Sequence, residues 1–426
     1  MDTSELIKFT RRTRFRNIPR RINELMQSSK SDYSSLNVAM YINPCEGGGD
    51  VSFAIRIWEY LFDWFGVSAY VFTTRPSTFI KSNKVPEHML YCVRDRESRE
   101  PFDCAVTKFV GIYSLDCKRR MKTLPVFDLF LVCPWVSEEL FTYNTLSRVF
   151  KESNPFNTYI FSAYNQDVNS DDQNYDFVSG LGGDRLGLTF VDVPKVPFKF
   201  VGLGEYILVH VSKTDSIDPL DCVRSFLRTM LKKYKRSITF VLPRLLDDYP
   251  YLFKDLSDSM GVGIIVMSSD DTLYYGNTSG SVVYTMRTDI LPVGLDDFSS
   301  LIINALPDFL MTGNQSVTDL LSLRESFTLY YQLMPWDKVF ANQLRKLSDH
   351  KHISNKRLSC GNWKMSYDPE RWERVREFDF RVLAYSKMSR IMELSLNMKR
   401  DKSLRRYVEL YLGSRKKETF LRKLMD

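Results

Sequence analysis

Residues 38–61 read VAMYINPCEGGGDVSFAIRIWEYL, and this stretch decides how the chain is interpreted. It opens with the apolar run Val38–Ile42, which leads directly into a turn of Pro and Gly residues. Beyond the turn, four apolar residues recur at the spacing of one helical face: Ala54, Ile57, Trp58 and Leu61. The pattern therefore predicts a strand, a turn and a helix, the beginning of a βα unit on a parallel sheet.

The same alternation continues along the chain and then starts again. In the first half it predicts strands at 67–73, 126–132 and 158–163. Two prolines and two glycines between 191 and 204 are typical of a linker. After it we expect strands at 206–211, 237–242, 262–267, 281–286 and 308–311, and helices at 218–234 and 295–305. The restart indicates two similar α/β halves.

The length of 426 residues exceeds one ordinary core, because a domain averages about 150 residues. We expect a basic segment at 1–35, α/β domains at 36–192 and 205–345, and a helical, charged extension at 346–426. Hydrophobic residues form 44% of the chain and charged residues 26%, the balance of a globular protein.

Several classes of protein are disfavoured by composition. Seven scattered cysteines without a CxxC pair, and only four histidines, argue against structural zinc and for free thiols in a reducing compartment. The longest apolar stretch, at 126–136, contains Asp128 and is too short to cross a membrane. The arginine-rich start has no apolar core behind it, unlike a secretory signal. We therefore expect a cytoplasmic protein with no transmembrane segment.

The net charge is +7, and much of it lies at the two ends of the chain. A polyanion such as nucleic acid, an acidic membrane surface or an assembly partner would match such ends. A basic surface that is merely solvated explains them equally well.

The first candidate site is the turn Gly47–Asp50. Gly48 and Gly49 precede a helix, where a backbone can approach an anionic ligand closely. The run lacks the Lys and Ser/Thr of a phosphate-binding P-loop and departs from GxGxxG. Arg75, after the second strand, leaves only a weak case for NADP.

Asp50, at the end of this turn, has two interpretations, one catalytic and one structural. At the mouth of a parallel sheet its carboxylate would take a proton from an acceptor nucleophile. Alternatively, Asp50 is the N-cap of the following helix, a position that Asp favours. The two roles are compatible.

The second candidate site is TGNQSVTD, residues 312–319, between the strand Asp308–Met311 and an apolar helix expected from Leu320. Donor groups concentrated at a helix N-terminus suit a diphosphate without a metal ion. Ser316 and Asp319 also match a capping box, which is a purely structural explanation. The expected donor contacts are Gly313, Asn314, Gln315, Ser316, Thr318 and Asp319, together with Gly48 and Gly49 of the first turn.

Smaller signals add two residues and set one aside. Arg185, in a Gly-rich loop before the linker, is a candidate phosphate contact or a plain surface residue. Tyr274 is a candidate platform for a nucleobase. His210, inside an expected strand, is interpreted as a core or satisfied histidine rather than a base. Further candidates are Tyr330, Tyr331, Gln332 and Trp336.

Together with LYYQLMPWDKVFANQLRKL downstream, the TGNQSVTD segment resembles the donor-binding region of GT-B glycosyltransferases. More specifically, the chain is similar to bacterial protein-arginine rhamnosyltransferases, which share a GD turn after the first strand. The resemblance implies two Rossmann-like domains facing each other across a cleft. It also implies Asp50 as general base and Asn314, Gln315 and Ser316 as nucleotide contacts. Asn314 and Gln315 replace the family's paired acids, so neither its arginine acceptor nor its rhamnosyl donor is carried over.

The leading hypothesis is therefore a metal-independent, inverting glycosyltransferase that needs no cofactor beyond its nucleotide-diphosphate sugar. The 205–345 domain would hold the donor, and the 36–192 domain would hold a protein, glycan or lipid-linked acceptor. The alternative is a non-catalytic two-lobed binding protein that works through its basic ends. A nucleotide-sugar epimerase and an NADP-dependent oxidoreductase are more distant alternatives.

Overall fold

The computed structural model divides the chain into two compact units, Met1–Thr189 with Val375–Asp426, and Phe190–Arg374. The basic segments 1–31 and 402–426 lie outside the residues that it describes. Those residues are 32–42, 44, 48–94, 111–113, 119, 121, 125–133, 158–162, 177–180, 186–189, 191–214, 218–324, 326–334, 338–347, 360–363 and 380–401.

The first unit is built on a seven-stranded sheet in the order β4-β3-β2-β1-β5-β6-β7. Neighbouring strands are parallel except for β3 with β4. The run β3-β2-β1-β5-β6 follows the 3-2-1-4-5 order of a Rossmann-like sheet. The strands are β1 Val38–Ile42, β2 Tyr70–Thr73, β3 Leu90–Arg94, β4 Gly111–Tyr113, β5 Leu129–Cys133, β6 Thr158–Ser162 and β7 Phe177–Val178.

Helix α3, Gly49–Phe65, follows β1 and carries most of the buried side chains of this unit's helices. It ends at Gly66, whose φ of 66° is the left-handed conformation that glycine adopts most easily. The short helices α4, Pro76–Ser82, and η2, Glu87–Met89, connect β2 to β3.

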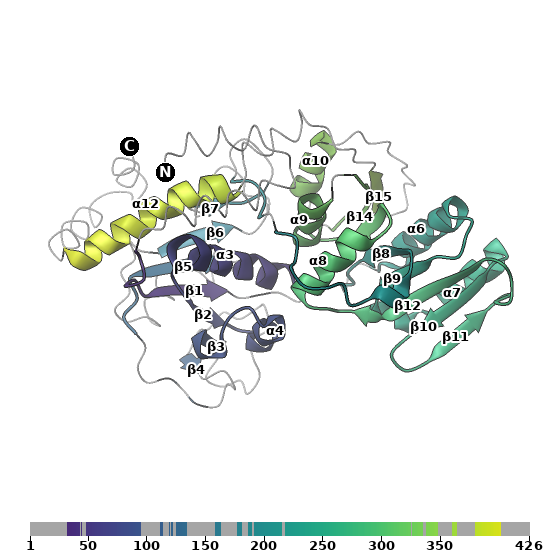
Figure 1. Cartoon of the computed structure of the whole chain (residues 1–426), viewed down its shortest axis with the longest axis horizontal. Helices are drawn as coiled ribbons and strands as arrows, with labels where there is room; N and C mark the ends of the chain where they lie inside the picture. Colours follow the sequence, from purple (N-terminus) through teal and green to yellow (C-terminus); the bar gives the residue numbers. More distant parts are fainter. Residues whose placement is uncertain are drawn as a thin grey trace. The chain divides into compact units, whose positions relative to one another are not determined.

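Helix α12, Phe380–Arg400, comes from the end of the chain but belongs to the first unit, and Figure 1 shows it in yellow beside this sheet. The ring of Tyr385 stacks on Phe65, with ring centroids 5.6 Å apart, and meets Trp64 edge-on. At the other end of α12, Lys399 donates to the Asp128 carboxylate at 2.9 Å. The expected C-terminal extension thus completes the core around the end of α3.

The second unit is built on an eight-stranded sheet in the order β11-β10-β12-β9-β8-β13-β14-β15. Only its edge pairs, β10 with β11 and β14 with β15, are antiparallel among the described pairings. The run β12-β9-β8-β13-β14 has the same spatial order, with β10, which precedes β12 in the chain, added outside β12. The strands are β8 Tyr206–His210, β9 Thr239–Pro243, β10 Gly263–Met267, β11 Thr272–Tyr275, β12 Val283–Leu291, β13 Asp308–Met311, β14 Thr328–Gln332 and β15 Cys360–Trp363.

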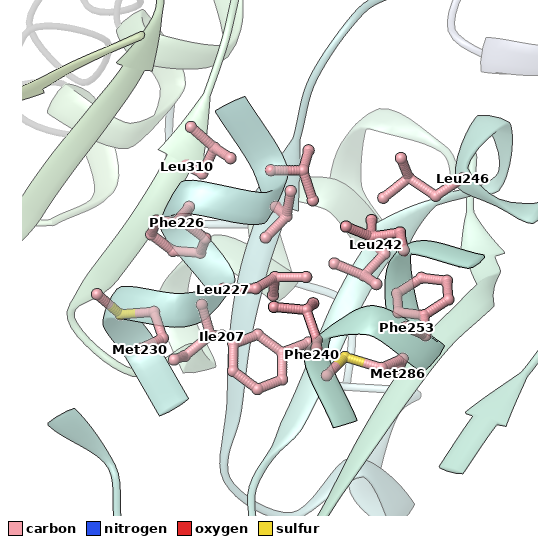
Figure 2. Close-up of a cluster of buried hydrophobic side chains, with 14 of the residues drawn as sticks. Ile207, Phe226, Leu227, Met230, Phe240, Leu242, Leu246, Phe253, Met286 and Leu310 are labelled. Atoms are coloured by element: carbon pink, nitrogen blue, oxygen red, sulfur yellow. The ribbon is translucent and has the colours of Figure 1, made fainter. Parts of the chain in front are cut away.

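One apolar core holds this unit together (Figure 2). Side chains from β8, β9, α6 and α7 meet in it, and Phe226, Phe240 and Phe253 are at most 2% exposed. Each such side chain contributes about 1.5–3 kcal/mol through burial. The helices of the unit are η5 Val201–Leu203, α6 Leu220–Lys233, η6 Arg244–Asp248, α7 Pro250–Met260, α8 Leu295–Asn304, α9 Asn314–Leu323 and α10 Lys338–Leu347.

The structure confirms the predicted fold class of two Rossmann-like α/β units and adds strand β15 within the extension expected at 346–426. Strands Val38–Ile42 and Asp308–Met311 have the predicted bounds. Cys133 and Cys222 are free, whereas Cys92 is disulfide-bonded, so the expectation of free thiols is wrong at that residue. Within the described part of the chain, no helix is long and apolar enough to cross a bilayer.

The start of β13 yields a stability prediction. The fully buried Asp308 carboxylate accepts from Lys233 Nζ at 2.6 Å and from the Tyr234 hydroxyl at 2.5 Å. Asp308→Ala leaves that hydroxyl without its acceptor, whereas half-exposed Lys233 can turn to water, so we expect a loss of about 2 kcal/mol of unfolding free energy.

Equilibrium urea unfolding measures this loss. Glu205→Ala is the matched control, because Glu205 forms an exposed ion pair with Arg236 at 2.8 Å and should cost less than about 1 kcal/mol. Equal losses in the two variants would contradict a structural role for the buried carboxylate.

Candidate functional site

The strand order of the second sheet reverses between β8 and β13. From β8 the chain proceeds to β9 on one side and, later, to β13 on the other. Connections leave the carboxyl ends of these strands in opposite directions, and the crevice so formed is where open α/β sheets bind ligands. His210 ends β8 and pairs in register with Met311 at the end of β13, and its main-chain carbonyl accepts the Thr312 N–H at 2.8 Å.

Helix α9 begins at this crevice, six residues earlier than the Leu320 start expected from the sequence. Its N-cap is Gly313, with φ 77° and ψ 148°, a conformation that glycine tolerates best. The space where a Cβ would be built on Gly313 is open. Because Gly313 has no side chain to cap the helix, the positive end of the α9 dipole is presented at the crevice.

The early start of α9 corrects the capping-box interpretation. Ser316 lies in the first turn of the helix rather than at its N-cap. Asp319, in the second turn of the helix, accepts from Gln315 Nε2 at 2.8 Å. The hydroxyl of Ser316 is left for another partner.

That partner is His210. Ser316 Oγ lies 3.2 Å from His210 Nδ1, which joins the first turn of α9 to the end of β8. Both residues are partly exposed, as is Gly313. The ring of Phe298, from the first turns of α8, meets the imidazole at a centroid distance of 5.3 Å and an angle of 63°. His210 therefore ends its strand at the crevice with Ser316 as a hydrogen-bond partner, so it is a satisfied histidine rather than one enclosed in the core.

The pKa of His210 lies below its ordinary value. Burial is the larger cause because it disfavours the charged imidazolium, and a hydrogen bond with the Thr312 backbone partly opposes it. The ring is therefore neutral at pH 7, so one of its nitrogens donates and the other accepts.

A buried amide holds the loops beneath this group. The Gln332 side chain, at the end of β14, accepts the Ser212 N–H at 2.9 Å and donates to the Ser212 carbonyl at 2.9 Å. The Thr312 hydroxyl donates to the main-chain carbonyl of Gln332 at 3.0 Å. The ends of β8, β13 and β14 are thereby tied together.

The other predicted donor contacts are placed differently. Asn314, Gln315, Thr318 and Asp319 are at most 7% exposed, and the Thr318 hydroxyl donates to the Asn314 carbonyl within the helix. Tyr274 is 65% exposed but lies on the edge strand β11, four places from β8 in the sheet order. The structure thus brings together Gly313, Ser316 and His210, and leaves Tyr274 apart.

The first sheet reverses its order between β1 and β5, and Asp50 lies there. Helix α3 begins at Gly49 with Gly48 as its N-cap, so the N-cap interpretation of Asp50 is wrong. Asp50 lies in the first turn and is 6% exposed. Its charge acts on Cys133, the last residue of β5, so the carboxylate lies near that strand end.

Three sequence-based candidates lie outside the described residues, namely Gly47, Arg185 and Trp336. Near Arg185, Gly180 and Gly187 form an antiparallel bridge. Among the residues that are described, no cluster of His, Cys, Asp and Glu has the composition of a metal site.

The environment of Cys133 gives a testable consequence for Asp50. Burial, and after it the Asp50 charge, raises the pKa of the Cys133 thiol to about 12. We expect slow alkylation of Cys133 by iodoacetamide in the folded protein at pH 8, and a modestly faster reaction in Asp50→Asn, because one of the two causes is removed.

Peptide mass spectrometry after timed alkylation measures both rates. Cys222, which is also free and buried but lies in the second unit, is the internal control and should not change. Rapid alkylation of Cys133 in the folded wild type, or an equal change at both cysteines, would contradict the assigned environment.

Comparison with known proteins gives similarity only to solved structures. No protein-family model and no curated protein sequence matches the chain. The solved structures include an alpha-glucosyltransferase bound to UDP and a DNA with a central A:G mismatch. It is 12% identical, with 84% of this chain and 100% of that chain covered and a TM-score of 0.36.

Two further solved structures are similar. One is a variant of S. aureus TarM in complex with fondaparinux, alpha-GlcNAc-glycerol and UDP, 10% identical over 89% of this chain and 99% of that chain, with a TM-score of 0.40. The other is the glycosyl transferase family 9 protein of Veillonella parvula. It is 8% identical over 75% of this chain and 93% of that chain, with a TM-score of 0.34. The Rossmann-like assignment itself depends on the strand orders of the two sheets.

Proposed function

We propose that this protein is a glycosyltransferase that moves a sugar from a nucleoside-diphosphate donor to an acceptor hydroxyl or nitrogen. The observation that carries the proposal is the convergence of Gly313, Ser316 and His210 at the carboxyl ends of β8 and β13. The donor diphosphate binds there, and the nucleoside follows the same edge of the second sheet.

The chemistry of this group suits a diphosphate leaving group. The N-terminus of α9 offers N–H groups and positive potential, and Ser316 adds a hydroxyl beside the His210 ring. Negative charge grows on the diphosphate as its bond to the sugar breaks, and donors already in place stabilise it without reorganisation. The proposal therefore needs no metal ion to hold the leaving group.

Asp50 is the proposed base. Its carboxylate takes the proton from the acceptor, whose oxygen or nitrogen forms a bond to the anomeric carbon. The bond from that carbon to the diphosphate oxygen breaks, and the diphosphate departs with the electron pair. A single in-line displacement of this kind inverts the anomeric centre.

The diphosphate site predicts how the protein responds to nucleotides. In a thermal-shift screen with UDP, GDP, dTDP and CDP, a ligand at a hundred times its Kd stabilises by about 2.7 kcal/mol. Ser316→Ala removes a hydrogen bond to a charged group, so the Kd of the selected nucleotide should rise about tenfold or more by calorimetry.

Ser322→Ala is the matched control on α9, since the Ser322 hydroxyl is buried and donates to the Thr318 carbonyl. It should leave nucleotide affinity unchanged. If no nucleotide binds, or if both variants weaken binding equally, the proposed site is wrong.

The base has its own test. Asp50→Asn keeps the shape of the side chain but cannot accept the acceptor proton, so turnover should fall by about 10²–10⁴ while nucleotide affinity stays near wild type. Turnover is followed as release of the nucleoside diphosphate in the presence of a panel of protein, glycan and lipid acceptors.

Asp63→Asn, near the other end of α3, is the matched control and should retain turnover. Wild-type turnover in Asp50→Asn would remove Asp50 from the mechanism. Loss of wild-type turnover in EDTA, restored by Mg²⁺, would contradict metal independence alone.

A further inference from the structure

The structure describes two histidines, and their surroundings differ. His88 is exposed on η2 of the first unit. His210 lies at the carboxyl end of β8, with Ser316 Oγ 3.2 Å from its Nδ1 and the Phe298 ring against its face. Only His210 is placed where the proposed diphosphate site would bring negative charge.

Charged side chains on the elements next to His210 interact with other groups of the protein. On α8, Asp297 forms an ion pair with Lys199 at 3.0 Å, and Asp296 precedes it. On α9, Asp319 accepts from Gln315. Beyond β8, Lys213 lies over the Tyr249 ring, 5.1 Å from its centroid.

We infer that His210 is a contact residue for the donor diphosphate and takes up one proton when the diphosphate binds. The inference rests on the proposed function and assigns a further residue, with a regulatory property, to the same site. Neutral His210 has one ring nitrogen that must act as an acceptor. Imidazolium donates from both nitrogens, so Ser316 Oγ accepts from Nδ1–H and turns its own proton toward the phosphate.

The direction of the pH effect follows from linkage. In the free protein, burial keeps the pKa of His210 below its ordinary value. A bound diphosphate brings negative charge next to the ring and raises that pKa. The complex therefore binds the proton more tightly, and donor affinity increases as the pH falls through the interval between the two pKa values. Above that interval the affinity is constant.

Calorimetry on the full-length chain tests the inference with UDP-glucose, GDP-mannose and dTDP-glucose as probes. Their phosphates are diesters that do not titrate between pH 5.5 and 8.5, so any proton taken up belongs to the protein. We expect Kd to decrease by up to about tenfold per pH unit toward acid. We also expect an apparent enthalpy that depends on the ionisation enthalpy of the buffer, corresponding to uptake of up to one proton.

Two variants make the assignment specific. Whatever affinity His210→Gln retains should be the same across this pH range, because glutamine keeps hydrogen-bonding capacity near Ser316 but does not titrate. His88→Gln is the matched control and should retain the wild-type slope. In wild type, NMR titration of the imidazole signals reports the same change directly, since the chain has only four histidines.

The outcomes separate the two proposals. If a probe binds with a Kd that does not change with pH, or if the pH dependence of Kd persists in His210→Gln, the role of His210 is overturned and the proposed diphosphate site remains intact. Loss of the pH dependence of Kd in His88→Gln as well as in His210→Gln also overturns the role of His210. If none of the probes binds at any pH, both proposals are wrong.

Discussion

The candidate site depends on one buried amide, that of Gln332. Three strands end beside one another at the carboxyl edge of the second sheet, and loops that leave such ends are usually the most mobile part of a fold. The Gln332 side-chain amide makes paired hydrogen bonds with the Ser212 backbone, and the Thr312 hydroxyl donates to the Gln332 main-chain carbonyl; together these bonds tie the three strand ends to one another. A buried polar group left unsatisfied costs about 1–3 kcal/mol, so this arrangement resists rearrangement.

That rigidity keeps Ser316 and His210 in contact. The first belongs to α9 and the second to β8, and they are 106 residues apart in the chain. A contact of 3.2 Å between such distant residues persists only if the elements that carry them are held in register. In the proposed function, preorganised donors of this kind would stabilise developing charge because they need not move during the reaction.

Much of the fold could be predicted from the sequence because parallel strands buried on both faces leave an unmistakable apolar signature. Val38–Ile42 and Asp308–Met311 are fully predictable for this reason. The antiparallel edge strand β11 was not predicted, since it is half exposed and its residues lack a continuous apolar run. Strand β15 likewise depends on pairing with β14 rather than on its own residues.

The site was harder to predict than the fold. The polar residues at 312–319 indicated a turn, yet most of them are helical, because Gly313 alone supplies the conformation that starts α9. In the sequence, nothing distinguishes His210 from a histidine in the middle of a strand. The strand pairing shows that it is the last residue of β8, opposite Met311. A signal did exist: a polar residue that ends an apolar strand at a reversal of strand order is a candidate ligand contact.

The first unit is discontinuous in the chain, since residues from Val375 onward rejoin those before Thr189. During synthesis, Trp64 and Phe65 emerge from the ribosome long before Tyr385 arrives to cover them. At about 5–20 residues per second, the roughly 320 residues between Phe65 and Tyr385 take about 16–64 s to translate. For that interval the aromatic end of α3 is a natural target for a chaperone, and the second unit, which is continuous, can complete its own core first.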